Sequence, residues 1–186
     1  STHAAHTTCP DRPSHERGYV WPLHPEFDIY IQDLATGTER LLVAGPGYDA
    51  EATVSPTGDR IVFTSTRSGD IELWTCDLQG GTLHQVTDTL GYDGGAFFSH
   101  DGTRLVYRAT EFTPGDPSEI ADYQETLSRD QVRPGHMEVY VIDADDRPVG
   151  GFGPPALGQG WSDAPAVDGR EGLVIVEGRA PQGPQD

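Results

Sequence analysis

Short runs of β-branched and aromatic residues, separated by turn-forming residues, recur along most of this 186-residue chain and predict β-strands rather than helices. Two such runs are RIVFT at 60–64 and RLVY at 104–107. Each follows a turn sequence, PTG at 56–58 and HDG at 100–102, that can reverse the chain into a hairpin. A second kind of run, such as VYVI at 139–142, ends at an Asp and is followed by further turn formers.

These runs repeat with a period of 44 residues. Tyr48 and Asp49 match Tyr92 and Asp93 at that offset. The Asp that ends the second kind of run recurs at positions 33, 77 and 143, so that the first interval is 44 and the second is 66, which is 44 plus an insertion of 22. Four short strands in a period of this length are typical of one β-propeller blade.

The repeated segments VSPTGDRIVF, FSHDGTRLVY, DIYIQDLATG and DIELWTCDLQGG resemble the blades of the TolB-like (WD40-like) β-propeller repeat family. The chain departs from the family pattern at Thr57, where the family has Asp, and at His100, where it has Pro. The resemblance implies an all-β fold, a partial β-propeller of about three four-stranded blades, and the residues of the insertion add one expected helix at about 117–129.

The repeat divides the chain, expected to be a single β-propeller segment over 1–186, into four parts. These are an incomplete blade (1–46), a blade (47–90), a blade with a helical insertion at 111–135 (91–158), and a degenerate incomplete blade (159–186). Closed propellers typically have about 4–8 blades. We therefore expect a fragment of a larger protein, or alternatively self-association through open blade edges.

The insertion carries the signals of a helix start. Asp116 is the expected N-cap, Pro117 the first helical residue, and Glu119 is placed for a capping box. An apolar stripe follows at Ile120, Tyr123 and Leu127. Such a helix either decorates the propeller rim or docks a partner.

Charge narrows the range of partners. The formal net charge is -18, and all twelve basic residues are Arg. Such a field repels nucleic acid and anionic lipid, and favours cations or basic partners. No stretch approaches the roughly 20 apolar residues of a membrane helix, so no membrane insertion is expected.

The strongest candidate site lies at the mouth of the propeller channel, because the first strand of each blade lines that channel. Tyr48, Asp49, Glu51, Tyr92 and Asp93 lie at the entry to this strand in two blades. Carboxylates gathered there suit Ca²⁺ or a basic peptide, so Asp49, Glu51 and Asp93 form a candidate Ca²⁺ site. The alternative is that these acids cap turns or accept backbone hydrogen bonds.

Two weaker sites remain. His3, His6 and His24 could approach one another through the long N-terminal loop and bind a transition metal, although scattered loop histidines are more often only solvated. Cys9 and Cys76 could form one disulfide in an oxidising compartment, or stay as two free thiols. The aromatic segment 19–22 is expected to cover a blade edge.

Two functions fit this sequence. The resemblance implies a non-enzymatic propeller module, periplasmic or secreted, that binds a protein or peptide. The alternative is the substrate-gating propeller of a larger hydrolase, a prolyl-oligopeptidase-like peptidase or an amidohydrolase, with its catalytic domain elsewhere. The chain contains no nucleophile elbow, H-E-x-x-H, phosphate loop or dinucleotide fingerprint, so we assign no catalytic residue.

Overall fold

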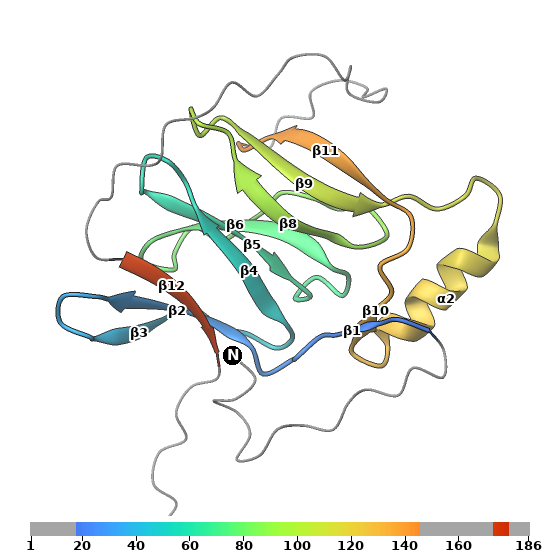
Figure 1. Ribbon diagram of the computed structural model, residues 1–186, viewed down its shortest axis with the longest axis horizontal. Helices are drawn as coiled ribbons and strands as arrows, with labels where there is room; N and C mark the ends of the chain where they lie inside the picture. The colour runs from blue at the N-terminus through green and yellow to red at the C-terminus, as the bar shows by residue number, and fades with distance from the viewer. Residues whose placement is uncertain (1–17, 146–172, 179–186) are drawn as a thin grey trace, which may run out of the picture.

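The computed structural model describes residues 18–145 and the backbone of strand 173–178. These residues form three small antiparallel sheets arranged side by side, and a separate two-stranded sheet, β1-β10 (Figure 1). The first sheet has the order β12-β2-β3, the second β4-β5-β6-β7, and the third β11-β9-β8. The strands are β2 (Asp28–Asp33), β3 (Glu39–Val43), β4 (Asp49–Val54), β5 (Arg60–Ser65), β6 (Glu72–Asp77), β7 (His84–Gln85), β8 (Asp93–Phe98), β9 (Arg104–Thr110), β11 (Met137–Asp143) and β12 (Leu173–Gly178).

The 44-residue period is confirmed by strand order, because β2 to β5 and β6 to β9 follow the same course. The three aspartates at its strand ends also share one role. The Oδ1 atoms of Asp33, Asp77 and Asp143 each accept a hydrogen bond from the backbone N–H two residues later, at 2.8, 2.9 and 2.9 Å. Each carboxylate therefore holds the turn that leaves its strand.

Two hydrophobic cores join neighbouring sheets. Between the first and second sheets, Ile29 packs against Ile61 and Phe63, and all three are fully buried. Between the second and third, Val62 and Leu73 pack against Leu105. The arrangement of blades side by side is therefore maintained by apolar contact between sheet faces.

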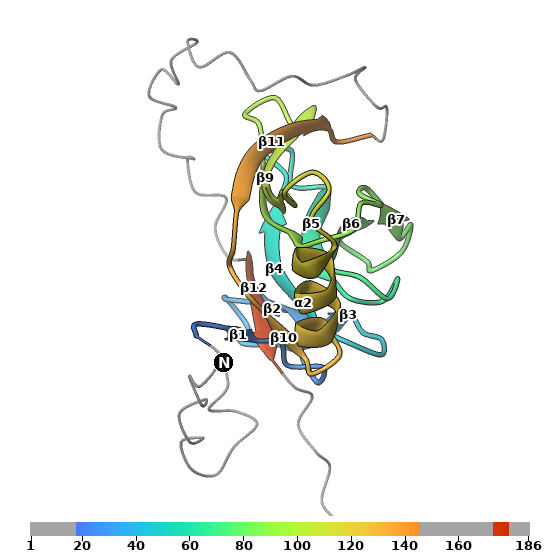
Figure 2. The ribbon, with the colours of Figure 1, turned by 90° about the vertical axis from the view of Figure 1, so that its right-hand side faces the viewer.

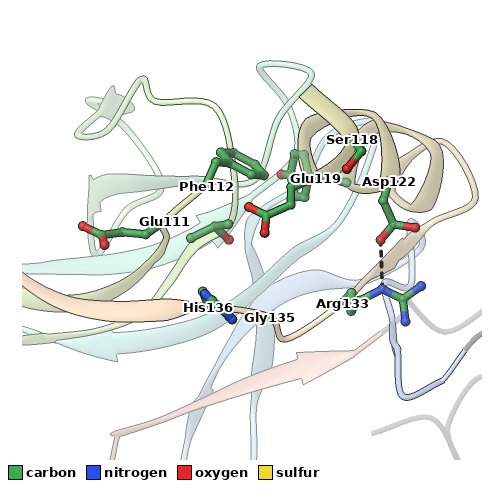
Figure 3. Close-up of a pocket in the computed structure, with 10 residues that line it drawn as sticks. Glu111, Phe112, Ser118, Glu119, Asp122, Arg133, Gly135 and His136 are labelled. Carbon is green, nitrogen blue, oxygen red and sulfur yellow. Dashed lines mark hydrogen bonds and ion pairs between the residues drawn. The ribbon is translucent and has the colours of Figure 1, made fainter. Parts of the chain in front are cut away.

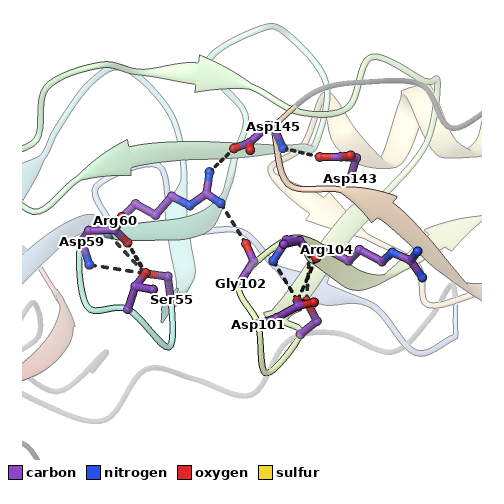
Figure 4. Close-up of polar contacts among 11 residues, drawn as sticks. Ser55, Asp59, Arg60, Asp101, Gly102, Arg104, Asp143 and Asp145 are labelled. Carbon is purple, nitrogen blue, oxygen red and sulfur yellow. Dashed lines mark hydrogen bonds and ion pairs between the residues drawn. The ribbon is translucent and has the colours of Figure 1, made fainter.

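Polar contacts around the β4–β5 and β8–β9 turns also join the second and third sheets (Figure 4). The Arg60 guanidinium pairs with Asp145 at 2.5 Å and donates to the Gly102 carbonyl at 2.8 Å. The turn before each second strand has its own internal bonds, from Ser55 to Asp59 at 2.6 Å and from Ser99 to Asp101 at 2.7 Å.

Strand β12 lies antiparallel to β2, with Ile175 opposite Ile31. The sequence repeat places residues 159–186 in a terminal blade of their own, whereas the structure puts this strand in the same sheet as β2. Residues 1–17, 146–172 and 179–186 lie outside the described part, so the predicted division of the chain at those positions stays a prediction.

The inserted helix α2 spans Pro117–Leu127, close to the predicted 117–129 (Figure 2). Asp116 is its N-cap and accepts from the Ser118 N–H at 2.9 Å. The capping-box expectation was wrong, because the Glu119 carboxylate accepts from the backbone N–H and hydroxyl of Thr113 instead. Among the described residues, no helix is long and apolar enough to span a bilayer.

Helix α2 is anchored to the propeller by its buried face. Tyr123 lies in a cluster with Ile71, Tyr92 and Val132, while Leu127 packs at its margin. The Tyr123 hydroxyl donates to Asp70 in the turn before β6. Helix α2 therefore has a fixed position against the junction of the second and third sheets.

The N-terminal aromatic segment is held to the same insertion. Strand β1 (Trp21–Pro22) pairs with β10 (Gln131–Val132), and the Leu23 N–H donates to the Asp130 carbonyl at 2.7 Å. Trp21 meets the Tyr92 ring edge-on at 6.1 Å. The segment thus pairs with the insertion and contacts Tyr92 next to β8, and its predicted role of covering a blade edge stays a prediction.

Candidate functional site

The channel-mouth carboxylates belong to three separate hydrogen-bond systems. Asp49, at the start of β4, is 1% exposed and accepts two hydrogen bonds of 2.8 Å from Arg67 Nη2. The Ser65 hydroxyl donates to the same carboxylate at 2.5 Å. Arg67 also lies over the rings of Phe63 and Trp74, 5.4 Å from each centroid. The Arg67 guanidinium therefore balances the charge of Asp49 at the contact between the first and second sheets, which we call the first junction; the contact between the second and third sheets is the second junction.

Glu51 bridges the second and third sheets from a β-bulge in β4. Its carboxylate accepts from the Thr64 hydroxyl at 2.8 Å, the Tyr92 hydroxyl at 2.9 Å and the Gly95 N–H at 2.8 Å. Its backbone has φ +57°, a left-handed conformation rare for non-glycine residues. Gly95, its equivalent 44 residues later, has φ +63° at the corresponding bulge in β8. The bulge is therefore a repeated feature, and the bonds of Glu51 offset its strain.

We predict that Glu51→Ala lowers the free energy of unfolding by about 2–3 kcal/mol, because it removes three hydrogen bonds to a charged acceptor and keeps the left-handed backbone. Glu51→Gly loses the same bonds but fits the backbone. It should retain about 1 kcal/mol more stability than the Ala variant. Urea unfolding of both variants measures the difference, and equal losses would show that the bulge carries no strain.

Asp93, the repeat partner of Asp49, lies in a different environment. It is 1% exposed, and it accepts from the Thr89 hydroxyl at 2.8 Å. Its neighbour is Glu72, which is 2% exposed and accepts from the Thr87 hydroxyl at 2.5 Å. Burial raises the pKa of Asp93 to about 6. Burial and the nearby charges of Asp93 and Asp70 raise the pKa of Glu72 to about 8.

This geometry corrects the expectation of a shared Ca²⁺ ion. Asp49 is occupied by Arg67, Glu51 by Tyr92 and Gly95, and Asp93 by Thr89. Within residues 18–145 and 173–178, no group of three or more His, Cys, Asp or Glu side chains is arranged to hold a metal ion. The alternative from the sequence, that these acids accept bonds from neighbouring protein groups, describes their contacts.

The two tyrosines of the predicted site also have structural roles. The backbone N–H of Tyr48 donates to the Thr66 hydroxyl at 2.9 Å, and that of Tyr92 to the Thr110 hydroxyl at 3.1 Å. Tyr92 is 2% exposed, so its ring is not available to a ligand. The residues of the predicted channel mouth therefore mainly connect blades.

The structure describes only one residue of the predicted histidine site and one of the two cysteines. His24 stacks on Phe27 at 4.7 Å, while His3 and His6 lie outside the described residues. Cys76 is buried with a free thiol, whose pKa burial raises to about 12, and Cys9 lies outside the described residues.

An open cavity of about 260 Å³ lies between α2 and the adjoining ends of β9 and β11 (Figure 3). It is lined by Thr110, Glu111, Phe112, Ser118, Glu119, Asp122, Tyr123, Arg133, Gly135 and His136. The rings of Phe112 and Tyr123 meet edge-on at 5.8 Å. Asp122 pairs with Arg133 at 2.9 Å. Three carboxylates against one guanidinium leave the lining acidic.

The sequence predicted the helix that forms one wall of this cavity, but not the cavity, because the other wall comes from residues 110–112 and 133–136, which carry no local motif signal. Sequence reasoning also missed Arg67 and Glu72, which the repeat itself contained. Position 111, equivalent to Arg67, is Glu, and position 28, equivalent to Glu72, is Asp. Comparing charges across the 44-residue offset would have shown that one junction has a cation that the other lacks.

No protein-family model matches the sequence, and no curated protein matches it. Solved structures do match. A TolB structure from Agrobacterium tumefaciens has 24% identity and a TM-score of 0.52, over 70% of this chain and 43% of that chain. TolB from Acinetobacter baumannii has 21% identity and a TM-score of 0.47, over 63% and 24%. The tricorn protease has 20% identity and a TM-score of 0.36, over 46% and 8%.

The chain thus spans less than half the length of these TolB structures. The Agrobacterium match covers most of this chain at a TM-score above 0.5, and it agrees with the repeated sheets described above. The chain therefore has the fold of a TolB-like β-propeller.

Proposed function

We propose that this chain is a non-enzymatic binding module of the TolB-like propeller type, periplasmic or secreted, that takes a basic segment of a protein or peptide. The observation that supports this proposal is the cavity beside α2. Helix α2, inserted after β9 at a point where the preceding described unit has no helix, is fixed by Tyr123 and Asp70 and forms one wall of it. Insertions of this kind are common sites of specificity on a repeated scaffold.

The lining of the cavity suits a cationic side chain. The Phe112 ring offers an aromatic face for an Arg or Lys side chain, while Glu111 and Glu119 supply negative charge beyond the Asp122–Arg133 pair. The net charge of -18 would further attract a basic partner and speed its approach.

The proposal predicts that a short fluorescein-labelled Gly-Ser peptide carrying Arg residues binds the protein, and that the same peptide with Gln in their place does not. Phe112→Ala and Glu111→Gln should each weaken binding about tenfold, which corresponds to the loss of one cation–π contact or one charge contact. Fluorescence anisotropy at near-physiological salt measures both peptides.

Asp88→Asn is the matched control, since it removes one exposed carboxylate outside the cavity lining. Equal weakening by Asp88→Asn and Glu111→Gln would mean that the peptide responds only to overall charge. Absence of binding by the Arg peptide would also contradict the proposal.

The alternative function, a substrate-gating propeller of a larger hydrolase, stays a hypothesis. The full parent gene separates the two roles. A neighbouring G-x-S-x-G segment with Asp and His, or a metal-binding barrel, would favour the hydrolase.

A further inference from the structure

The outer face of the third sheet is apolar and exposed. Phe97 on β8 is 60% exposed and Val139 on β11 is 52% exposed. The strand register places Phe97 beside Val106 and Val141, so these side chains lie on one face of the sheet. The opposite face, which includes Leu105, packs against the second sheet.

The repeat shows what this face is built to do. Val106 is equivalent to Val62 of the second sheet, 44 residues earlier, and Val139 is equivalent to Leu73, 66 residues earlier. Val62 and Leu73 are both 0% exposed, because the third sheet covers them. The exposed face is therefore the kind of surface that a following blade covers inside this same molecule.

The first sheet presents the complementary kind of face. Trp74 of the second sheet packs toward the first sheet, and Tyr30 is its equivalent 44 residues earlier. Tyr30 is itself only 5% exposed, whereas its cross-strand partner Leu41 is 47% exposed, and Gln32 pairs with the exposed Glu39. This face of the first sheet is therefore the kind that a preceding blade covers.

The two faces carry charges of opposite sign. The outer face of the third sheet carries the exposed Arg104 and Arg108 and the half-buried Asp143 opposite Arg104, so its arginines outnumber its acids. The outer face of the first sheet carries the exposed Glu39. Opposite charges at a docking surface favour this pairing over the pairing of either face with itself.

We propose that the outer face of the third sheet docks the first sheet of a second copy of this chain. The three blade sheets described for each copy then form a ring of six, within the 4–8 blades of closed propellers. A two-fold axis makes the two junctions identical, so that the assembly closes at two copies and does not grow further.

The test is the mass of this 186-residue chain in solution, measured by light scattering after size exclusion at near-physiological salt. We expect twice the chain mass of 20.1 kDa. Phe97→Asp and Leu41→Asp, one on each face, should each give a monomer. Leu90→Asp, an equally simple change at an exposed residue outside both faces, should remain a dimer.

Mixing the two monomeric variants provides a sharper result. The Leu41→Asp copy keeps an intact third-sheet face and the Phe97→Asp copy an intact first-sheet face, so the mixture should form a heterodimer through one junction. A wild-type monomer, larger open-ended assemblies, or a Leu41→Asp variant that stays dimeric would overturn the proposal.

A readout on the wild type keeps the proposal testable if a variant fails to fold. Backbone amide exchange in β8 and β11 should slow as protein concentration rises, because docking covers that sheet. Protection that does not depend on concentration would overturn the proposal.

Discussion

Asp49→Asn is expected to lower the free energy of unfolding by about 3–5 kcal/mol, because it leaves a buried guanidinium without its counter-charge. The side chains of Arg67 and Asp49 are only 14% and 2% exposed. Arg67 is also confined between the rings of Phe63 and Trp74, so it cannot turn to solvent without losing that packing. Urea or thermal unfolding near neutral pH measures the loss.

The double variant Asp49→Asn/Arg67→Gln tests the cause. Removal of both charges leaves no unpaired ion in the junction, so part of the lost stability should return. If the loss of unfolding free energy in the double variant equals the sum of the losses in the two single variants, Asp49 and Arg67 act independently. In that case the ion pair does not hold this junction together.

The sequence allowed prediction of those parts of the fold that depend on local chemistry. The turn aspartates at 33, 77 and 143 follow from side-chain bonding within two residues, and the structure shows that role at all three. The start of α2 followed in the same way from Asp116 and Pro117. Such features can be predicted from the sequence because the hydrogen-bond donor and acceptor are only a few residues apart in the chain.

The pairing of β12 with β2 could not be predicted this way. Their residues are about 140 positions apart, as the pairing of Leu173 with Asp33 shows. The sequence of either segment alone does not indicate which strand it pairs with. The helix stripe illustrates the same limit. Tyr123 is buried, but Thr126 is buried beside it and Ile120 is only half-buried, because the neighbouring loop decides which face is covered.

The candidate Ca²⁺ site failed for a related reason. Recurrence of Asp49 and Asp93 correctly predicted equivalent positions, but equivalent backbone positions do not have equivalent partners. The cation at Arg67 is replaced by Glu111 in the next unit, and the hydroxyl of Ser65 is replaced by Ala109. The function of a repeated carboxylate therefore depends on residues about 16 to 18 positions away, which differ between blades.

The second junction should make the protein less stable as the pH rises from about 4 to about 8. The pKa of Glu72, about 8, and that of Asp93, about 6, both lie above their ordinary values of 4.5 and 3.8. The folded state thus holds protons that the unfolded state has released, so the free energy of unfolding decreases with pH across this interval. The stabilisation is complete below about pH 4 and is lost as the pH passes the folded pKa values.

Glu72→Gln should remove the part of this dependence that comes from Glu72, since an amide can donate to Asp93 at any pH, whereas the pKa of Asp93 stays raised by burial. Thermal unfolding of the variant and the wild type is compared at pH 5 and pH 8. At pH 8 the variant should have a Tm several degrees above that of the wild type, for a gain in unfolding free energy on the order of 2 kcal/mol, and at pH 5 the difference should be smaller. A variant that melts with the wild type at both pH values would show that Glu72 and Asp93 do not share a proton.

Restoring the cation is the complementary experiment. Ala109→Ser/Glu111→Arg copies Ser65 and Arg67 of the first junction into the second. The new guanidinium should stabilise the ionised Asp93 and so reduce the loss of stability between pH 5 and pH 8. Glu111 also accepts a hydrogen bond from Tyr140, so the variant is best compared with Ala109→Ser/Glu111→Gln, which loses that charge without adding a cation. An unchanged pH dependence in the Arg variant would mean that its cation does not reach the acid pair.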